Sequence, residues 1–228
     1  APVRLGRMAH QHPRFQYRID PLHHALSGAR MRTRADISAL VSSRICHDLV
    51  SPLGAIGNGV ELLGMSGAPE GPELQLINES VENANARLRF FRIAFGAASA
   101  DQVISRSEIL ATLSAASRGG RLAYEWRAVG DLPRRAVRAA FLLIQCLESA
   151  MAIGGHIIVD LQGDTWVITG ESDRMNIDAD LWDSLTNARA RVPLSSALVQ
   201  FALLPEVLDE LKRILSLAFD TGKITARF

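Results

Sequence analysis

The stretch Ser43–Leu63, SRICHDLVSPLGAIGNGVELL, decides how the rest of the chain is interpreted. On a helix with about 100° per residue, its apolar residues gather within roughly 80° of one another. They are Ile45, Leu49, Leu53, Ile56, Val60 and Leu63. His47 lies roughly 165° from the centre of that stripe, so its imidazole is predicted to face water. Because another protein can reach such a ring, we expect His47 to be a phosphoacceptor.

The residues that share the face of His47 are small or polar. They are Ser43, Ser51, Gly54, Asn58 and Glu61. A strip of such low relief offers a flat surface on which a second protein can lie. We therefore predict that these residues form partner contacts and take no part in the chemistry.

Two long helices joined by a short turn are predicted around this stretch. The first runs from Ala35 to about Gly64, and Pro52 is expected to kink it one turn after His47. A break at 64–69 is followed by a helix over 70–96 whose apolar residues alternate spacings of three and four, as in a coiled-coil seam. They are Leu74, Ile77, Val81, Ala84, Leu88, Phe91 and Phe95. One hairpin cannot bury both of its apolar faces, so a homodimeric four-helix bundle is predicted. The alternative, in which the hairpin packs only on its own chain, stays open.

Beyond Asp101 the pattern changes to that of an α+β domain. We expect helices at 105–117, 133–155 and 195–210, strands at 121–127, 156–161 and 165–170, a helix or irregular cover at 178–189, and a final hairpin within 212–228. These elements predict a largely antiparallel sheet with helices on one face. The expected domains are an arm at 1–33, the helical hairpin at 34–99 and the α+β domain at 100–228.

Composition narrows the function classes. Residues 1–33 carry six arginines, one acid and four of the six histidines, with few aliphatic residues, so a disordered basic arm or extension is expected there. The net charge of +1 gives no reason to expect nucleic acid as a partner. No run reaches the roughly 18 apolar residues of a membrane helix, and no signal pattern or paired cysteines are seen. A cytoplasmic protein without a metal site or a membrane partner is therefore expected.

The motif CHDLVSPLGAI, Cys46–Ile56, resembles the H-box of bacterial sensor histidine kinases. A helical hairpin followed by a sheet-and-helix domain is similar to the dimerisation and ATPase modules of those kinases. Within that group the chain most resembles the ChpT-type histidine phosphotransferases of alphaproteobacteria, which keep HDLVSP. The resemblance covers about residues 35–228, and its H-box part is the more specific.

The departures from the kinase pattern change the function that the resemblance implies. Gln145 and Ser149 stand where the kinases carry asparagines that bind Mg²⁺ and nucleotide. The Asp-x-Gly-x-Gly loop and the glycine-rich lid are missing; the corresponding regions read TGESDRMNIDADLW and ARVPLSSALVQ. A degenerate ATPase-like domain that binds no ATP and no cofactor is therefore expected.

The resemblance also implies a role for the chain in a phosphorelay. His47 would take phosphate from a receiver aspartate of a hybrid kinase and pass it to the receiver domains of response regulators, which supply the Mg²⁺. Asp48 would hydrogen-bond a ring nitrogen, and Arg44 would screen the phosphohistidine. Two alternatives stay open: an active histidine kinase core, and a scaffold that binds receiver domains without phosphotransfer.

Overall fold

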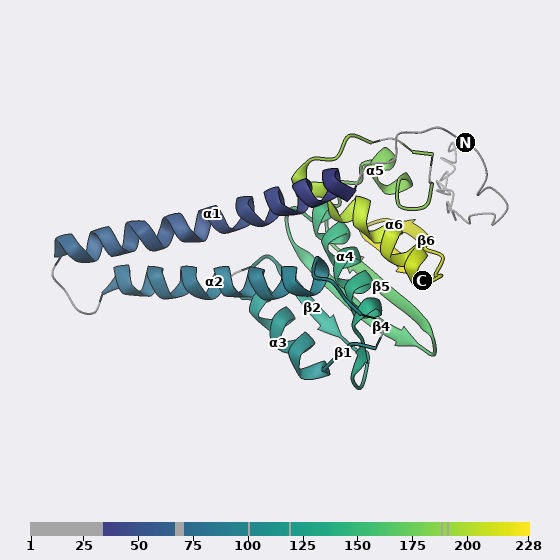
Figure 1. Ribbon diagram of the computed structural model, residues 1–228, viewed down its shortest axis with the longest axis horizontal. Helices are drawn as coiled ribbons and strands as arrows, with labels where there is room; N and C mark the ends of the chain where they lie inside the picture. The colour runs from purple at the N-terminus through teal and green to yellow at the C-terminus, as the bar shows by residue number, and fades with distance from the viewer. Residues whose placement is uncertain (1–33, 67–70, 100, 119, 188, 191) are drawn as a thin grey trace, which may run out of the picture.

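The computed structural model describes residues 34–66, 71–99, 101–118, 120–187, 189–190 and 192–228. A helical hairpin projects from an α+β body, which contains the sheet (Figure 1). This arrangement confirms the predicted fold class. The arm predicted at 1–33 lies outside the described residues.

The hairpin consists of α1 (Arg34–Ser66) and α2 (Pro72–Ala94), close to the predicted ranges. Helix α1 runs unbroken through Pro52, which is buried. The two helices approach closely at Gly59, where an added Cβ would lie 2.5 Å from Cγ1 of Ile77. Only a residue without a side chain fits at this crossing.

The stripe predicted on α1 divides in two. Ile45, Leu49, Ile56 and Leu63 are partly buried. Leu53 and Val60 remain 59% and 57% exposed. Helix α2 behaves alike, because Ile77, Ala84 and Phe91 are covered whereas Val81 and Leu88 are exposed. Each helix therefore has one apolar face inside the hairpin and a second apolar face that the single chain leaves uncovered.

The body is built on a five-stranded sheet with the order β2-β4-β5-β7-β6. Its strands are β2 (Leu122–Trp126), β4 (Gly155–Gln162), β5 (Thr165–Glu171), β6 (Ser216–Asp220) and β7 (Lys223–Arg227). Strands β2 and β4 are parallel, and every other pair in this sheet is antiparallel, as the prediction of a largely antiparallel sheet requires. A second small sheet pairs β1 (Val103–Ile104) with β3 (Leu132–Pro133). It was not predicted, because two-residue strands show no periodicity.

Five helical segments accompany the sheet: α3 (Arg106–Ser117), α4 (Arg134–Ala150), α5 (Ala179–Asp183), the 3-10 turn η1 (Ser196–Leu198) and α6 (Gln200–Glu210). The expectation that a helix extends over 133–155 was wrong. Helix α4 ends at Ala150 because its C-cap, Met151, leaves the helical conformation at φ −109° and ψ 50°. The chain then turns through Gly154 and Gly155, at φ of 110° and 149°, and Gly155 opens β4. The helix predicted at 195–210 is instead a 3-10 turn followed by α6.

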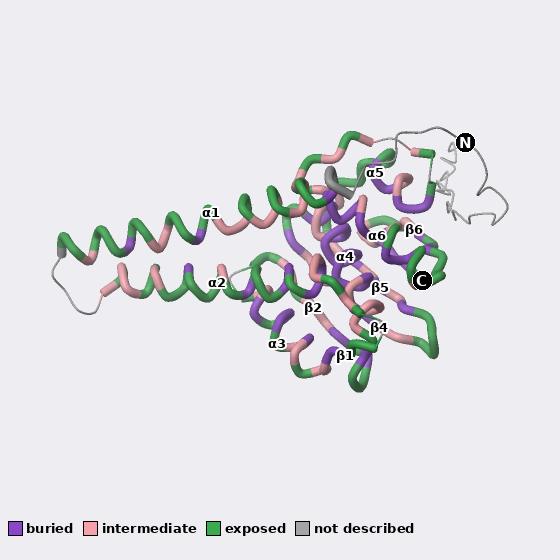
Figure 2. The backbone as a smooth tube through the Cα atoms, in the orientation of Figure 1, coloured by how far each residue is buried: buried purple, intermediate pink, exposed green. Residues whose placement is uncertain are grey.

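Helix α4 forms the centre of the body, and it is buried without interruption from Ala139 to Leu147 (Figure 2). The same apolar core takes in Phe90, Phe91 and Ile93 from the last turns of α2. Three arginines near the start of α4 donate hydrogen bonds to carbonyls at the end of α2 and just beyond. Arg134 bonds Arg92 O at 2.8 Å, Arg138 bonds Ala94 O at 3.2 Å and Arg135 bonds Ala98 O at 3.0 Å. These bonds satisfy carbonyls that a helix end leaves unpaired, and they join the hairpin to the body.

Candidate functional site

His47 and Asp48 are sequence neighbours with opposite environments. The His47 side chain is 80% exposed, whereas that of Asp48 is 9% exposed. Nδ1 of His47 lies 3.0 Å from Oδ1 of Asp48. A carboxylate only accepts hydrogen bonds, so this contact places the ring proton on Nδ1. The lone pair of Nε2 is then free on the exposed side of the ring.

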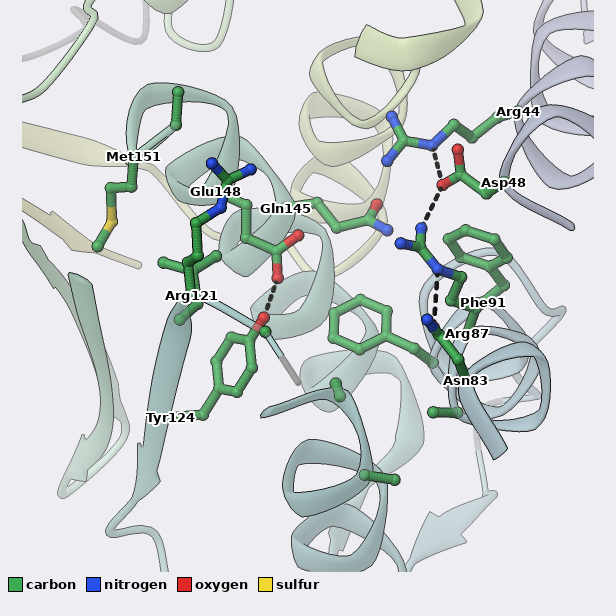
Figure 3. A pocket seen from close by; sticks show the side chains of 17 residues that line it. Arg44, Asp48, Asn83, Arg87, Phe91, Arg121, Tyr124, Gln145, Glu148 and Met151 are labelled. Carbon is green, nitrogen blue, oxygen red and sulfur yellow. Dashed lines mark hydrogen bonds and ion pairs between the residues drawn. The ribbon is translucent and has the colours of Figure 1, made fainter. Parts of the chain in front are cut away.

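Two arginines hold the other oxygen of Asp48 (Figure 3). Nε of Arg44 donates to Oδ2 at 2.8 Å, and Nη1 of Arg87 lies 3.5 Å from the same atom. Arg44 also donates to the backbone carbonyl of Ala197 in η1, so its guanidinium joins α1 to the body. Arg87 in turn donates from Nε to Oδ1 of Asn83 at 3.2 Å.

Arg87 is the site residue that sequence reasoning missed. It lies on α2, far from His47 in the chain, and no motif marks it. One signal was present: Arg87 continues the inward-facing series Ile77, Ser80, Ala84 and Phe91 at heptad spacing. A charged residue at such a position indicates a buried partner, which is Asp48.

A hollow of about 340 Å³ adjoins His47 between the two helices. Helix α1 contributes His47, Asp48, Ser51, Pro52 and Ala55, and α2 contributes Ser80, Asn83 and Arg87. Of the predicted partner contacts, Ser51 lines this hollow. Ser43, Gly54, Asn58 and Glu61 lie elsewhere on α1, and all four are exposed. A partner that reaches His47 therefore meets a shallow polar depression together with this exposed strip.

A second cavity, of about 420 Å³, lies between the hairpin and the body (Figure 3). Arg44, Asp48 and Arg87 line one side, and Tyr124 and Glu148 line another. The Tyr124 hydroxyl donates to Oε1 of Glu148 at 2.6 Å. Burial raises the pKa of the Glu148 carboxyl, although Tyr124 and the two arginines favour its charged form. Burial, helped by the Glu148 charge, also raises the pKa of Tyr124.

The two positions compared above with nucleotide-binding asparagines are both in α4. Gln145 is 4% exposed, and its Oε1 has no hydrogen-bond partner among the described residues. Ser149 donates to the carbonyl of Cys146 at 2.6 Å. Within the described parts of the chain, no group of three His, Cys, Asp or Glu side chains is placed to hold a metal ion. No helix in those parts is long and apolar enough to cross a membrane.

Comparison with known proteins gives three findings. The family model for the histidine phosphotransferase C-terminal domain matches residues 106–222. The protein phosphotransferase ChpT of Brucella abortus (strain 2308) is 36% identical over 171 residues, which cover 72% of this chain and 81% of that protein. A solved structure of a bacterial phosphotransferase matches at 30% identity with a TM-score of 0.74, covering 86% of this chain and 96% of that one.

Proposed function

Because this chain belongs to the histidine phosphotransferase family, we propose that it relays phosphoryl groups through His47 between receiver domains of two-component signalling proteins. The carrying observation is the exposed imidazole whose Nδ1 lies 3.0 Å from Oδ1 of the buried Asp48. This contact orients the ring with Nε2 available to a partner. The receiver domain of a hybrid kinase acts as donor, and those of response regulators act as acceptors.

The transfer needs little from this chain. Nε2 of the neutral ring attacks the phosphorus of a receiver aspartyl phosphate, so a P–N bond forms while the P–O bond to the aspartate breaks. The aspartate leaves as a carboxylate, and the ring keeps its Nδ1 proton and becomes cationic. Asp48 stabilises that cation through the bond that it already accepts. The receiver brings the Mg²⁺ that neutralises charge on the moving phosphoryl group.

We place the dimer contact on the uncovered apolar face of the hairpin. On α1 this face follows Cys46, Val50, Leu53, Gly57, Val60 and Gly64, all exposed and spaced alternately by four and three. On α2 the equivalent series is Asn78, Val81, Asn85, Leu88 and Arg92. In each helix these residues come one position after the residues that face the other helix, which is a rotation of about 100° around the helix axis. Because α1 and α2 are antiparallel, both rotations lead to the same side of the hairpin, which suits a second copy.

The hollow beside His47 belongs to the opposite side. Its α2 residue Asn83 comes one position before the inward-facing Ala84, whereas the uncovered apolar face comes one position after the inward-facing residues. Asn83 therefore lies about 100° from the inward face in the opposite direction around α2. In the proposed dimer both histidines therefore stay open to receiver domains. Partner docking and dimerisation then use different faces of the same two helices.

The proposal gives this chain no ATP-dependent autokinase activity. A kinase must carry its bound nucleotide to the histidine, whereas here the arginines of α4 tie the body to the end of α2. Gln145 and Ser149 lack the side chains that the kinases use at the matching positions. Titration calorimetry with Mg²⁺·ATP, and incubation with radiolabelled ATP, should give neither binding nor labelling. The proposed cytoplasmic location agrees with a role between receiver domains.

Label transfer from a phosphorylated receiver domain tests the function. We expect the wild-type chain to acquire an acid-labile, base-stable label that His47→Ala abolishes. His156→Ala is the matched control, because His156 is also accessible but lies on β4 beside Glu125, and it should label normally. A His47→Ala protein that still accepts the label would disprove the assignment. A wild-type protein that binds the receiver without labelling would favour the scaffold alternative.

A further inference from the structure

The hydrogen bonds around Asp48 extend into the second helix and the body. From them we propose that Arg44 and Arg87 are positioning residues for phosphotransfer. They fix the Asp48 carboxylate so that it holds Nδ1 of the histidine and leaves Nε2 as the nucleophile. The inference rests on the proposed function of His47 and adds the groups that prepare this ring.

Arg44 connects the nucleophile to the body. Its Nε donates to Oδ2 of Asp48 at 2.8 Å, and its Nη1 donates to the carbonyl of Ala197. The guanidinium is a rigid planar fork, so two acceptors in different elements fix its orientation. An unbroken series of contacts then runs from the η1 backbone through Arg44 and Asp48 to the ring.

Arg87 approaches the same carboxylate from α2. Its Nη1 lies 3.5 Å from Oδ2, and its Nε is held by Asn83 at 3.2 Å. Both guanidinium contacts are therefore made to Oδ2, which leaves Oδ1 for the imidazole. The 3.5 Å separation makes the Arg87 contribution chiefly one of charge, whereas that of Arg44 depends on the geometry of its fork.

This arrangement gives Arg44 a different role from screening the phosphohistidine. The Arg44 side chain is 19% exposed, and its two acceptors are Oδ2 of Asp48 and the carbonyl of Ala197. Arg44 therefore acts on the ring through Asp48, whose Oδ1 faces Nδ1 of His47. The body therefore contributes to the site, because a carbonyl of η1 helps to orient the nucleophile.

The variants that test this proposal are Arg44→Ala, Arg44→Lys, Arg87→Ala and Arg87→Lys in the full chain. Arg89→Ala is the matched control, because the bond that Arg89 makes among the described residues is to the Asn85 carbonyl of its own helix. The ¹⁵N chemical shifts of the His47 ring report which nitrogen carries the proton. Potassium phosphoramidate phosphorylates the ring directly with release of ammonia, and ³¹P NMR distinguishes phosphate on Nε2 from phosphate on Nδ1. The rate of labelling by a phosphorylated receiver domain is measured in parallel.

We expect the wild-type and Arg89→Ala proteins to carry the proton on Nδ1 and phosphate on Nε2. Arg44→Ala and Arg87→Ala should give mixed tautomers and slow the receiver reaction about tenfold. Arg87→Lys should restore most of the rate because it restores the charge. Arg44→Lys should not, because an ammonium group cannot reproduce the fork. Thermal unfolding confirms that each variant is folded, and the lysine variants carry the test if an alanine variant is not.

Wild-type tautomers and rates in all four arginine variants would overturn the inference while His47→Ala still abolishes labelling. Equal losses in Arg89→Ala would overturn it too, because the effect would then not depend on Asp48. Labelling that survives in His47→Ala would instead defeat the proposed function itself. The two failures are thus separable in one set of proteins.

Discussion

Arg138 of α4 donates from Nε to the carbonyl of Ala94, the last residue of α2, at a distance of 3.2 Å. The guanidinium is partly buried, and that burial lowers its pKa, although the acidic side chains of Glu206 and Glu210 oppose the shift. A hydrogen bond from a charged group to a helix-end carbonyl is worth more than a neutral one. This contact therefore contributes to the rigidity with which the hairpin is held on the body.

Arg138→Met should lower the free energy of unfolding by about 2 kcal/mol, because the Ala94 carbonyl loses its charged donor. Urea denaturation measures the change. Arg213→Met is the control, since Arg213 is exposed and bonds the Leu208 carbonyl through its backbone amide, and it should be neutral. Equal stabilities of the two variants would show that the bond from Arg138 to the Ala94 carbonyl does not contribute to the stability of the fold.

Gly59→Ala should destabilise the hairpin, because the new methyl group would lie 2.5 Å from Ile77 Cγ1 and 3.2 Å from the Glu73 carbonyl. The helices must separate to admit it, at a cost of about 1–3 kcal/mol. Gly54→Ala makes the same chemical change on α1 with nothing within 4 Å, so helix propensity should stabilise it by about 1 kcal/mol. Opposite shifts in the unfolding midpoint are the expected result; shifts of the same sign would contradict the close approach at Gly59.

Leu53→Glu and Val81→Glu should each convert a dimer into monomers. Both side chains lie on the uncovered face, and a carboxylate in a bundle core loses its hydration. Asn58→Glu adds the same group to α1 about 120° away from that face and should leave the dimer intact. Light scattering after size-exclusion chromatography gives the masses. A wild-type protein that is monomeric at every concentration would refute the proposed bundle.

Glu148→Gln should change how stability depends on pH. The folded-state pKa of Glu148 is raised by burial, so the folded protein holds this proton more tightly than the unfolded chain. The wild-type protein must therefore lose stability as the pH rises from about 4.5 through the raised pKa. The glutamine is neutral at every pH and keeps an acceptor for Tyr124, so its stability relative to wild type should increase between pH 5 and pH 8.

Glu171→Gln should change the pH dependence of stability in the opposite direction, because the folded-state pKa of Glu171 is lowered rather than raised. The hydrogen bond from Lys223 lowers the Glu171 pKa. That contribution is present above the unfolded pKa and is lost as the pH falls through the lowered one. Because this pair is exposed, the effect should be small. Thermal unfolding measures the contrast, with Glu148→Gln compared to wild type at pH 5 and pH 8, and Glu171→Gln compared to wild type at about pH 3 and pH 7. A Glu148→Gln protein whose stability runs parallel to wild type over its range would contradict the raised pKa of Glu148.

Heptad spacing predicted the hairpin because repeated apolar residues determine which faces of a helix avoid water. The same spacing placed His47 on the exposed side of α1. Sequence alone did not separate the inward-facing Ile56 from the outward-facing Leu53, because both are apolar and adjacent in the repeat. That distinction depends on where α2 lies, which is a property of the tertiary structure.

The partners of Asp48 were beyond sequence reasoning for a related reason. Arg87 reaches this carboxylate from α2, and Arg44, which also bonds it, is held by the carbonyl of Ala197 in η1; both elements lie far along the chain. Local pattern predicts helices and turns, but it does not say which distant polar groups will meet. The end of α4 shows the converse, because the glycines at 154 and 155 predicted the end of the helix, whereas the chain already leaves the helical conformation at Met151.

The opposite exposure of His47 and Asp48 separates chemistry from recognition within a single turn of helix. In the proposed function, a partner protein would touch the ring and the exposed strip around it, while Asp48 and its arginines already hold their positions in the free chain. Substitutions on the strip can therefore alter which visitors are accepted without disturbing the nucleophile. A phosphotransferase of this kind could change its binding partners through surface substitutions that leave His47, Asp48 and their hydrogen bonds unchanged.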